Sequence, residues 1–203
     1  MRKLVVAAFL TLDGVMQAPG GPEEDTSGDF AHGGWSVNYW DDRIAEAMDK
    51  LMGKPFDLVL GRKTYEIFAG SWPHMTEEQG AKPINEATKH VASHTLTTLD
   101  WQNSVPIEGD VVKALRKLKQ QDGPELQVHG SANLLQTLIR ADVIDEYHLK
   151  TFPVVVGSGK RLFEAGTMPA GLKLVESITS TTGVVISTYV PAGELVTGSF
   201  GPS

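Results

Sequence analysis

The chain has 203 residues, 41% of them hydrophobic and 21% charged, which is typical of one globular domain with its own core. It contains no cysteine, which excludes disulfides, zinc–thiolate sites, iron–sulfur clusters and thiol nucleophiles and fits a reducing, cytoplasmic compartment. The net charge of −7 argues against nucleic-acid binding, and no apolar run approaches the ~20 residues that a membrane span needs. An anionic ligand would therefore need a local cluster of positive charge.

The N-terminal segment begins with a short apolar run at residues 4–10, which predicts a buried strand rather than an export signal. Residues 14–40 are rich in Gly, Pro and Asp and carry Trp35, Tyr39 and Trp40. We expect a functional role for this segment, because such long loops are uncommon inside compact domains. Asp41 then has the position of a helix cap, and Gly53 is the expected stop of that helix.

The remaining chain alternates strand-like apolar runs with helix-like periodic ones, a pattern that indicates an α/β sheet with crossover helices. Further strands are expected at residues 56–60, 89–93, 125–129, 146–156, 172–177 and 184–190. Helices are expected at residues 65–68, between Asp110 and Gly123, and after Gly130-Ser131, with an exposed loop at residues 71–83. The expected fold is a three-layer α/β/α domain with a central mixed, mostly parallel sheet.

Residues 1–190 account for this predicted domain, and residues 191–203 form a tail rich in Gly, Ser and Pro. Composition alone describes the tail as flexible. The alternative is that it packs on the body of the protein or on a neighbouring subunit.

Three predicted strands end in short polar turns of similar design. These turns are Gly61-Arg62-Lys63-Thr64, Ser93-His94-Thr95 and Gly130-Ser131-Ala132-Asn133. In a parallel sheet they would lie along one edge, where the carboxyl ends of strands meet ligands. Two of them open predicted helices, whose free N–H groups attract phosphate.

Arg62 and Lys63 are unusual at a helix start, because the helix dipole disfavours cations there by roughly 0.3–1 kcal/mol. A bound anion would turn this repulsion into attraction. The alternative is that both side chains simply extend into solvent, and the tetrapeptide by itself does not decide between the two.

The order of these three strand-end turns along the chain resembles that in the dihydrofolate reductase superfamily. The C-terminal half, from Val143-Ile144-Asp145-Glu146-Tyr147-His148-Leu149 to Pro153-Val154-Val155-Val156-Gly157-Ser158-Gly159-Lys160-Arg161-Leu162-Phe163, resembles the C-terminal reductase domain of the bacterial riboflavin-biosynthesis protein. The segment Thr11-Leu12-Asp13-Gly14-Val15-Met16 is similar to stand-alone members of that branch. The resemblance covers about residues 2–190, and it implies a dihydrofolate-reductase-like fold and NADPH as the cofactor.

The resemblance also implies which turn residues meet the cofactor. The first turn, Gly61, Arg62, Lys63 and Thr64, is expected at NADPH phosphates, with Ser93 and His94 near the adenosine 2′-phosphate. The third turn, Gly130, Ser131, Ala132 and Asn133, is expected at the pyrophosphate. Ser131 stands where many members have a second glycine, so it trades close backbone approach for a hydroxyl donor.

Substrate residues are less well defined by the sequence. Asp13 is a candidate proton donor, but turn chemistry alone also explains an Asp-Gly pair. Trp35 and Trp40 are candidates to stack on a flat heterocycle, whereas aromatic residues at a helix entry often belong to the core. Asp41 is explained by helix capping without any chemistry.

Two other motifs do not match the functional patterns that they resemble. Gly157-Ser158-Gly159-Lys160-Arg161 does not match a phosphate-binding loop, because Val154 stands where that pattern needs Gly, and Arg161 where it needs Ser or Thr. His90 and His94 straddle a predicted strand end without the Glu of a zinc protease, which favours a structural or solvent role over metal binding.

The resulting hypothesis is a homodimeric NADPH-dependent reductase that transfers hydride to a small, pterin- or pyrimidine-like heterocycle, with the proton coming from water or from Asp13. The alternative is a non-catalytic nucleotide-binding module on the same fold, since one fold hosts several roles.

Overall fold

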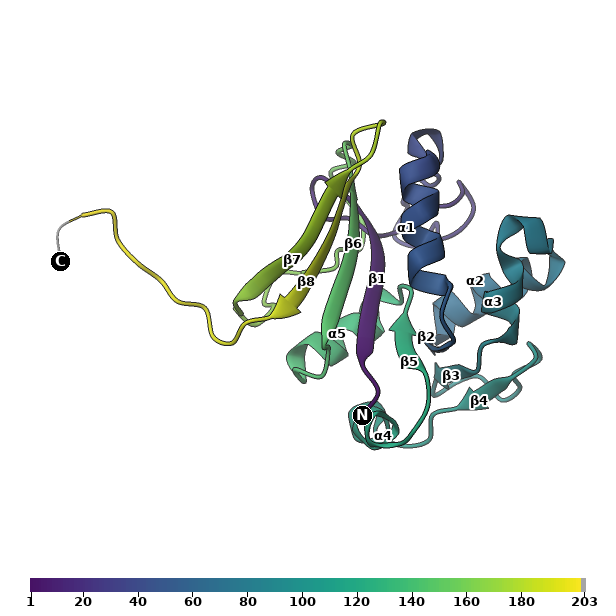
Figure 1. Cartoon of the computed structure of the whole chain (residues 1–203). Coiled ribbons are helices and arrows are strands. Elements are labelled where there is room, and N and C mark those ends of the chain that lie inside the picture. Colours follow the sequence, from purple (N-terminus) through teal and green to yellow (C-terminus); the bar gives the residue numbers. More distant parts are fainter. Residues whose placement is uncertain (202–203) are drawn as a thin grey trace.

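A computed structural model describes residues 1–201, which are built around an eight-stranded sheet with the order β4-β3-β2-β5-β1-β6-β8-β7 (Figure 1). The strands are β1 (Leu4–Thr11), β2 (Phe56–Gly61), β3 (Lys89–Ala92), β4 (Ser104–Pro106), β5 (Glu125–Val128), β6 (Glu146–Phe152), β7 (Leu172–Thr179) and β8 (Val185–Pro191). Strands β1 to β6 pair in parallel with one another, whereas β8 runs antiparallel to both β6 and β7. The expected mixed, mostly parallel sheet is confirmed.

Helices cover both faces of the sheet. They are α1 (Asp42–Met52), α2 (Arg62–Ser71), α3 (Ala81–Glu86), α4 (Val111–Gln120) and α5 (Ala132–Arg140), with 3-10 turns at Val37–Tyr39, Trp72–His74 and Glu77–Gln79. Figure 1 shows α1 and α5 on opposite sides of β1. Side chains of α4 and α5 pack on one face, and those of α1, α2 and α3 on the other, which gives the three layers.

The central strands are buried on both faces. Leu4, Val6 and Leu126 pack under α5, where Leu135 is also fully buried. Burial of each such side chain contributes roughly 1.5–3 kcal/mol relative to exposure. The near-continuous apolar runs that predicted these strands are therefore explained by helices on both sides.

The capping predictions are confirmed at two helices. The Asp41 carboxylate accepts the Ile44 N–H at 3.0 Å at the start of α1. The Asp110 carboxylate does the same for the Lys113 N–H at 2.8 Å at the start of α4. Asp41 also accepts hydrogen bonds from Thr181 and Thr182, so one residue caps a helix and holds the β7–β8 turn.

Several predicted boundaries were wrong. The helix expected at residues 65–68 is longer at both ends, and the expected loop at residues 71–83 contains 3-10 turns and the start of α3. Strand β4 lies in a stretch without a strand pattern, because a three-residue edge strand that ends in Pro106 leaves almost no periodicity to detect. The strand expected at residues 146–156 ends at Phe152, because Pro153 has no N–H to donate to the sheet.

The tail leaves the body after β8. The Ala192 N–H donates to the Gly171 carbonyl at 2.8 Å, and beyond this contact the segment extends away from the sheet (Figure 1). Residues 202 and 203 of the predicted tail lie outside the described part of the chain. No helix within residues 1–201 is long and apolar enough to cross a membrane.

Candidate functional site

A cavity of about 1660 Å³ lies at the carboxyl ends of the parallel strands. A drug-sized ligand fills roughly 300–1,000 Å³, so this cavity has room for two small molecules side by side. Its wall includes every residue of the three strand-end turns predicted to hold the cofactor: Gly61, Arg62, Lys63, Thr64, Ser93, His94, Gly130, Ser131, Ala132 and Asn133. The structure therefore brings together residues from three separate parts of the sequence.

The turn after β5 is held directly against the turn after β2. The Ser131 hydroxyl accepts the Gly61 N–H at 2.8 Å and donates to the Thr64 Oγ1 at 2.6 Å. A Cβ on Gly61 would lie 2.9 Å from the Ser131 Cβ, so only glycine permits this approach. Because the Ser131 hydroxyl hydrogen is engaged, the hydroxyl of Thr64 is the one left free to donate to a ligand.

The backbone of the β5–α5 turn is unusual. Gly130 has a φ of 99° and Ser131 has a φ of 74°, a left-handed conformation that costs a serine roughly 1–2 kcal/mol. The two hydrogen bonds of Ser131 hold it there. Such strain is typical of segments whose backbone must face a ligand.

Ser93 forms the turn after β3 in a similar way. Its hydroxyl oxygen accepts the N–H groups of Thr95 at 3.1 Å and Leu96 at 3.0 Å. The hydroxyl hydrogen remains free to donate into the cavity. His94 is exposed beside it.

Two helix starts and two basic side chains lie at this edge of the sheet. Neither α2 nor α5 has a side-chain cap, so the first N–H groups of both helices are free to bind an anion. Arg62 and Lys63 are exposed at the start of α2. Within residues 1–201, the one ion pair of Arg62 is a long, exposed contact of 3.4 Å with Glu66, which contributes at most about 1 kcal/mol. This is the local cluster of positive charge that an anionic ligand requires on a chain with a net charge of −7.

The other part of the cavity wall is apolar. Ala7 and Phe9 of β1, Met48 of α1 and Met16 of the long loop line it. Phe9 packs on Phe152, with ring centroids 5.3 Å apart. A flat, largely apolar molecule would fit this apolar floor. Sequence alone does not distinguish these residues from core residues, because both are apolar.

The long loop after β1 forms one side of the cavity and is fastened to the segment after β6. The Lys160 ammonium donates to the carboxylate of Asp25 and to the Ser27 hydroxyl at 2.7 Å, and the Lys160 N–H donates to Gln17 Oε1 at 3.0 Å. Lys160, Gln17 and Asp25 all line the cavity. The segment Gly157-Ser158-Gly159-Lys160-Arg161, which does not match a phosphate-binding loop, thus holds the long loop after β1 in place through Lys160.

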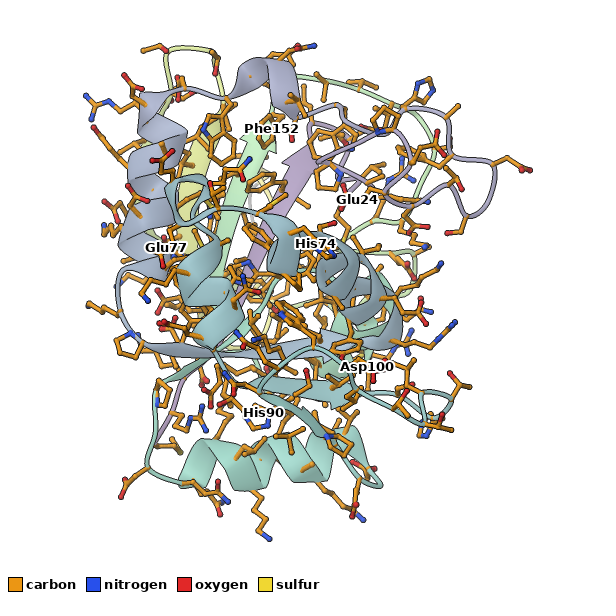
Figure 2. The ribbon with its side chains drawn as sticks, turned by 90° about the vertical axis from the view of Figure 1, so that its right-hand side faces the viewer. Glu24, His74, Glu77, His90, Asp100 and Phe152 are labelled. Atoms are coloured by element: carbon orange, nitrogen blue, oxygen red, sulfur yellow. The ribbon has the colours of Figure 1, made fainter. Side chains whose placement is uncertain are left out.

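Glu24 is a cavity residue that sequence reasoning missed. It lies on the same loop (Figure 2), and burial raises the pKa of its carboxyl, although the N–H of Gly20 donates to it at 2.6 Å. No motif marks a single glutamate in an irregular loop.

His90 lies between the sheet and α4, away from this loop (Figure 2), and its ring is 3.3 Å from Asp57.

Asp13 does not line the cavity. Its carboxylate accepts hydrogen bonds from the Thr11 hydroxyl at 2.6 Å and the Gly157 N–H at 2.9 Å, and the Thr11 bond in particular lowers its pKa. A carboxylate that is held ionised is a poor proton donor. The structure gives Asp13 the role of joining two loops, and we do not retain it as the proton donor.

Trp35 and Trp40 also lie outside the cavity wall. Trp35 donates its indole N–H to the Gln17 carbonyl at 2.8 Å and packs edge-on against Phe152. Trp40 packs on Phe9 with centroids 6.1 Å apart. Trp35 therefore packs against the core at the helix entry, whereas Trp40 is 49% exposed and reaches the cavity only through its contact with Phe9.

His129 is the second cavity residue that sequence reasoning missed. It follows β5 directly and stacks on Phe56, with centroids 6.2 Å apart and an interplanar angle of 27°. Burial, followed by the nearby charges of Lys150 and His148, lowers its pKa to about 3. The only signal in the sequence was its place immediately before Gly130.

Curated proteins resemble this chain over most of its length. The protein YyaP of Bacillus subtilis strain 168 is 27% identical over 193 residues, which cover 93% of this chain and 94% of YyaP. The protein YwjB of the same organism is 28% identical over 117 residues, or 58% of this chain and 63% of YwjB.

Solved structures share the fold at low sequence identity. A Shewanella sp. PV-4 protein described as a riboflavin biosynthesis protein has a TM-score of 0.68 and 18% identity, covering 93% of this chain and 98% of its own. A pyrimidine reductase-like protein from Corynebacterium diphtheriae has a TM-score of 0.62 and 13% identity, with coverages of 95% and 93%. Dihydrofolate reductase from Enterococcus faecalis, solved with NADP(H) and RAB-propyl, has a TM-score of 0.58 and 15% identity, with coverages of 94% and 96%.

These neighbours confirm the dihydrofolate-reductase-like fold that the resemblance implied. The model of the RibD C-terminal domain family matches residues 2–186, nearly the whole described chain. The chain therefore belongs to the RibD C-terminal domain family.

Proposed function

We propose that this protein is an NADPH-dependent reductase that transfers hydride to a small, pterin- or pyrimidine-like heterocycle in the cytoplasm. The observation that carries the proposal is the convergence of three strand-end turns on one cavity of about 1660 Å³, with cationic and apolar parts. Membership of the family and the reductases among its structural neighbours support the same reading.

The cationic part of the cavity fits a dinucleotide phosphate. The first N–H groups of α2 and α5 are free, and the positive ends of both helix dipoles lie at this region. Gly130 has no side chain that would keep a ligand from its backbone. Arg62, with Lys63 beside it, would bind the 2′-phosphate that distinguishes NADPH from NADH. The hydroxyls of Thr64 and Ser93 would add neutral donors.

The apolar part of the cavity fits two flat rings. When bound, NADPH would supply the hydride, and the protein supplies orientation and electrostatics. Phe9, Met16 and Met48 would exclude water from the reacting rings, and the loop fastened by Lys160 would close the site on one side.

A second candidate function is a non-catalytic nucleotide-binding module. One observation favours this alternative. Within residues 1–201, none of the cavity-lining residues from β1 or α1 is acidic. A reductase without a carboxylic acid there would have to draw its proton from water or from a group on the long loop such as Glu24.

Two measurements on the full chain separate these functions. Titration of the intrinsic tryptophan fluorescence should show tighter binding of NADPH than of NADH, and steady-state assays with pterins, pyrimidines and ketones should show NADPH oxidation with a heterocycle. Binding without oxidation across that panel would favour the non-catalytic module. If the protein binds neither cofactor at millimolar concentration, the proposal that the three turns bind NADPH is refuted.

We also propose that the protein is a homodimer. Every residue of the edge strand β7 is exposed, including Leu172, Leu174, Val175 and Ile178. The tail carries further exposed apolar side chains at Leu195, Val196 and Phe200. An edge strand with unpaired backbone groups and apolar side chains is a template for pairing with a second copy.

A further inference from the structure

A chain of hydrogen bonds runs from the end of α1 to the wall of the cavity through Gln127. This side chain is 1% exposed. Its Nε2 atom donates to the Leu51 carbonyl and to the Glu125 carboxylate, both at 3.0 Å, and its Oε1 atom lies 2.8 Å from the Nε2 of His129.

The orientation of the Gln127 amide follows from its partners. A backbone carbonyl and a carboxylate oxygen both accept hydrogen bonds, so the amide group that faces them must be the NH₂. Turning the amide over would place three oxygens together in a buried site. Oε1 of Gln127 therefore faces His129, and the Nε2 of His129 must carry the hydrogen that it accepts.

The other ring nitrogen of His129 is then a bare acceptor. Burial and the charges of Lys150 and His148 lower the pKa of His129 to about 3, so the ring carries a single hydrogen at neutral pH. That hydrogen is on Nε2, which leaves the lone pair on Nδ1. Within residues 1–201, Nδ1 of His129 has no hydrogen-bond partner.

The surroundings keep the ring in this state. Val6 pairs with Val128 and Ala7 with His148, so His129 and His148 lie on either side of Ala7 on the face covered by α1. Lys150 follows two residues further along β6 and is 2% exposed. His148, whose Nε2 lies 2.8 Å from Glu146, does not line the cavity, whereas the ring of His129 does.

We propose that His129 Nδ1 is a specificity-determining acceptor that selects a heterocycle bearing an amino or ring N–H group and disfavours one with a carbonyl or an apolar group at that position. The identification of this ligand as the substrate rests on the proposed function. The tautomer of His129 and the preference for a donor do not.

The tautomer is testable in the unliganded, ¹⁵N-labelled full chain. Long-range ¹H–¹⁵N correlation spectra distinguish the two neutral tautomers from the charged ring, and the His129 signal is identified by its loss in His129→Leu. The expected result is a neutral ring with its hydrogen on Nε2, unchanged between pH 5 and pH 8. A hydrogen on Nδ1, or a ring that becomes charged in this range, would overturn the proposal.

The selectivity is testable with 4-aminopyrimidine and 4-methylpyrimidine, which have similar shapes but differ in the donor. Wild-type protein is expected to bind the amino compound at least about fivefold more tightly, because the methyl compound leaves a partly buried acceptor unpaired. His129→Leu should bind both alike, whereas the control His148→Asn should retain the preference. NADPH affinity should be the same in all three proteins.

The outcomes separate this proposal from the proposed function. If the protein prefers the amino compound but oxidises no NADPH, the acceptor role of His129 is supported and the proposed reductase activity is refuted. Equal binding of both probes by the wild type, or a loss of NADPH affinity in His129→Leu, would remove the inference whatever the activity. If His129→Leu fails to fold, His129→Gln identifies the His129 signal in the same way, and the tautomer is still measured on the wild type.

Discussion

Arg62 begins α2 at the carboxyl end of β2, with its side chain about half exposed and lightly held by Glu66. We predict that Arg62→Ala weakens NADPH binding about ten- to a hundredfold and NADH binding much less, because a guanidinium pairs best with a phosphate dianion. Fluorescence titration with both cofactors measures the difference.

The matched control for Arg62 is Arg43→Ala, since Arg43 makes an equally long exposed contact of 3.4 Å with Glu46 on α1, away from the cavity wall. This variant should bind both cofactors as the wild type does. If Arg62→Ala weakens NADPH and NADH binding equally, Arg62 contacts the pyrophosphate and not the 2′-phosphate. If neither affinity changes, Arg62 does not contact the cofactor.

Asp41 links helix capping to the stability of the protein in acid. The Thr181 hydroxyl, followed by backbone N–H donors, lowers its pKa from 3.8 to about 2. A lowered pKa in the folded state means that the carboxylate stabilises the fold above pH 3.8 and that this contribution is lost as the pH falls towards 2.

We therefore predict that Asp41→Asn lowers the unfolding temperature at neutral pH and that the difference from wild type shrinks between pH 4 and pH 2. Thermal unfolding followed by circular dichroism measures it. Asp42→Asn, one residue further along the same first turn, is the control and should show a smaller effect. A difference that stays constant down to pH 2 would contradict the assignment.

At the scale of elements, the β2–α2 and β5–α5 turns fit together through Gly61 and Ser131. Gly61→Ala is expected to cost about 1–3 kcal/mol of unfolding free energy, because the new Cβ would meet the Ser131 Cβ at 2.9 Å. The φ of Gly61 is −80°, which alanine adopts freely, so the cost comes from the contact and not from the backbone.

Ser131→Gly removes the atoms that cause this clash and relieves the left-handed φ of Ser131. The double variant should therefore recover much of the loss, with a coupling of about 0.5–3 kcal/mol in denaturant titrations. Gly70→Ala is the control, since nothing lies within 4 Å of a Cβ there and alanine favours the helix. If the changes in unfolding free energy of the two single variants add up in the double variant, the two turns are not energetically coupled.

At the scale of the whole molecule, we predict that the protein has about twice its chain mass of 21.9 kDa in light scattering at micromolar concentration. Val175→Lys with Ile178→Lys should make it a monomer, because both side chains are exposed on β7, by 59% and 38%. Val105→Lys places the same change on β4, at the opposite edge of the sheet, where Val105 is 45% exposed, and should leave the dimer intact. A wild-type monomer at high micromolar concentration would refute the dimer.

Local chemistry made much of the fold readable from sequence. Apolar runs bounded by Gly and Pro marked seven of the eight strands, and Asp41 and Asp110 marked two helix starts, because capping and burial act over a few residues. The cavity wall contains all ten residues of the predicted cofactor turns for a similar reason. Parallel strands end at one edge, so polar turns that follow them must meet.

Tertiary structure decided the state of individual side chains. Whether Asp13 serves catalysis or holds loops together depends on Gly157, which is far away in the sequence, and the free lone pair of His129 depends on the carbonyl of Leu51 in another element. The sequence by itself determined the layered sheet and the turns that edge it, because periodicity and strand ends are local properties. Only the tertiary structure decided which donors in those turns are already used and which remain free for a ligand, because a hydrogen bond belongs to two residues and the chain brings them together only on folding.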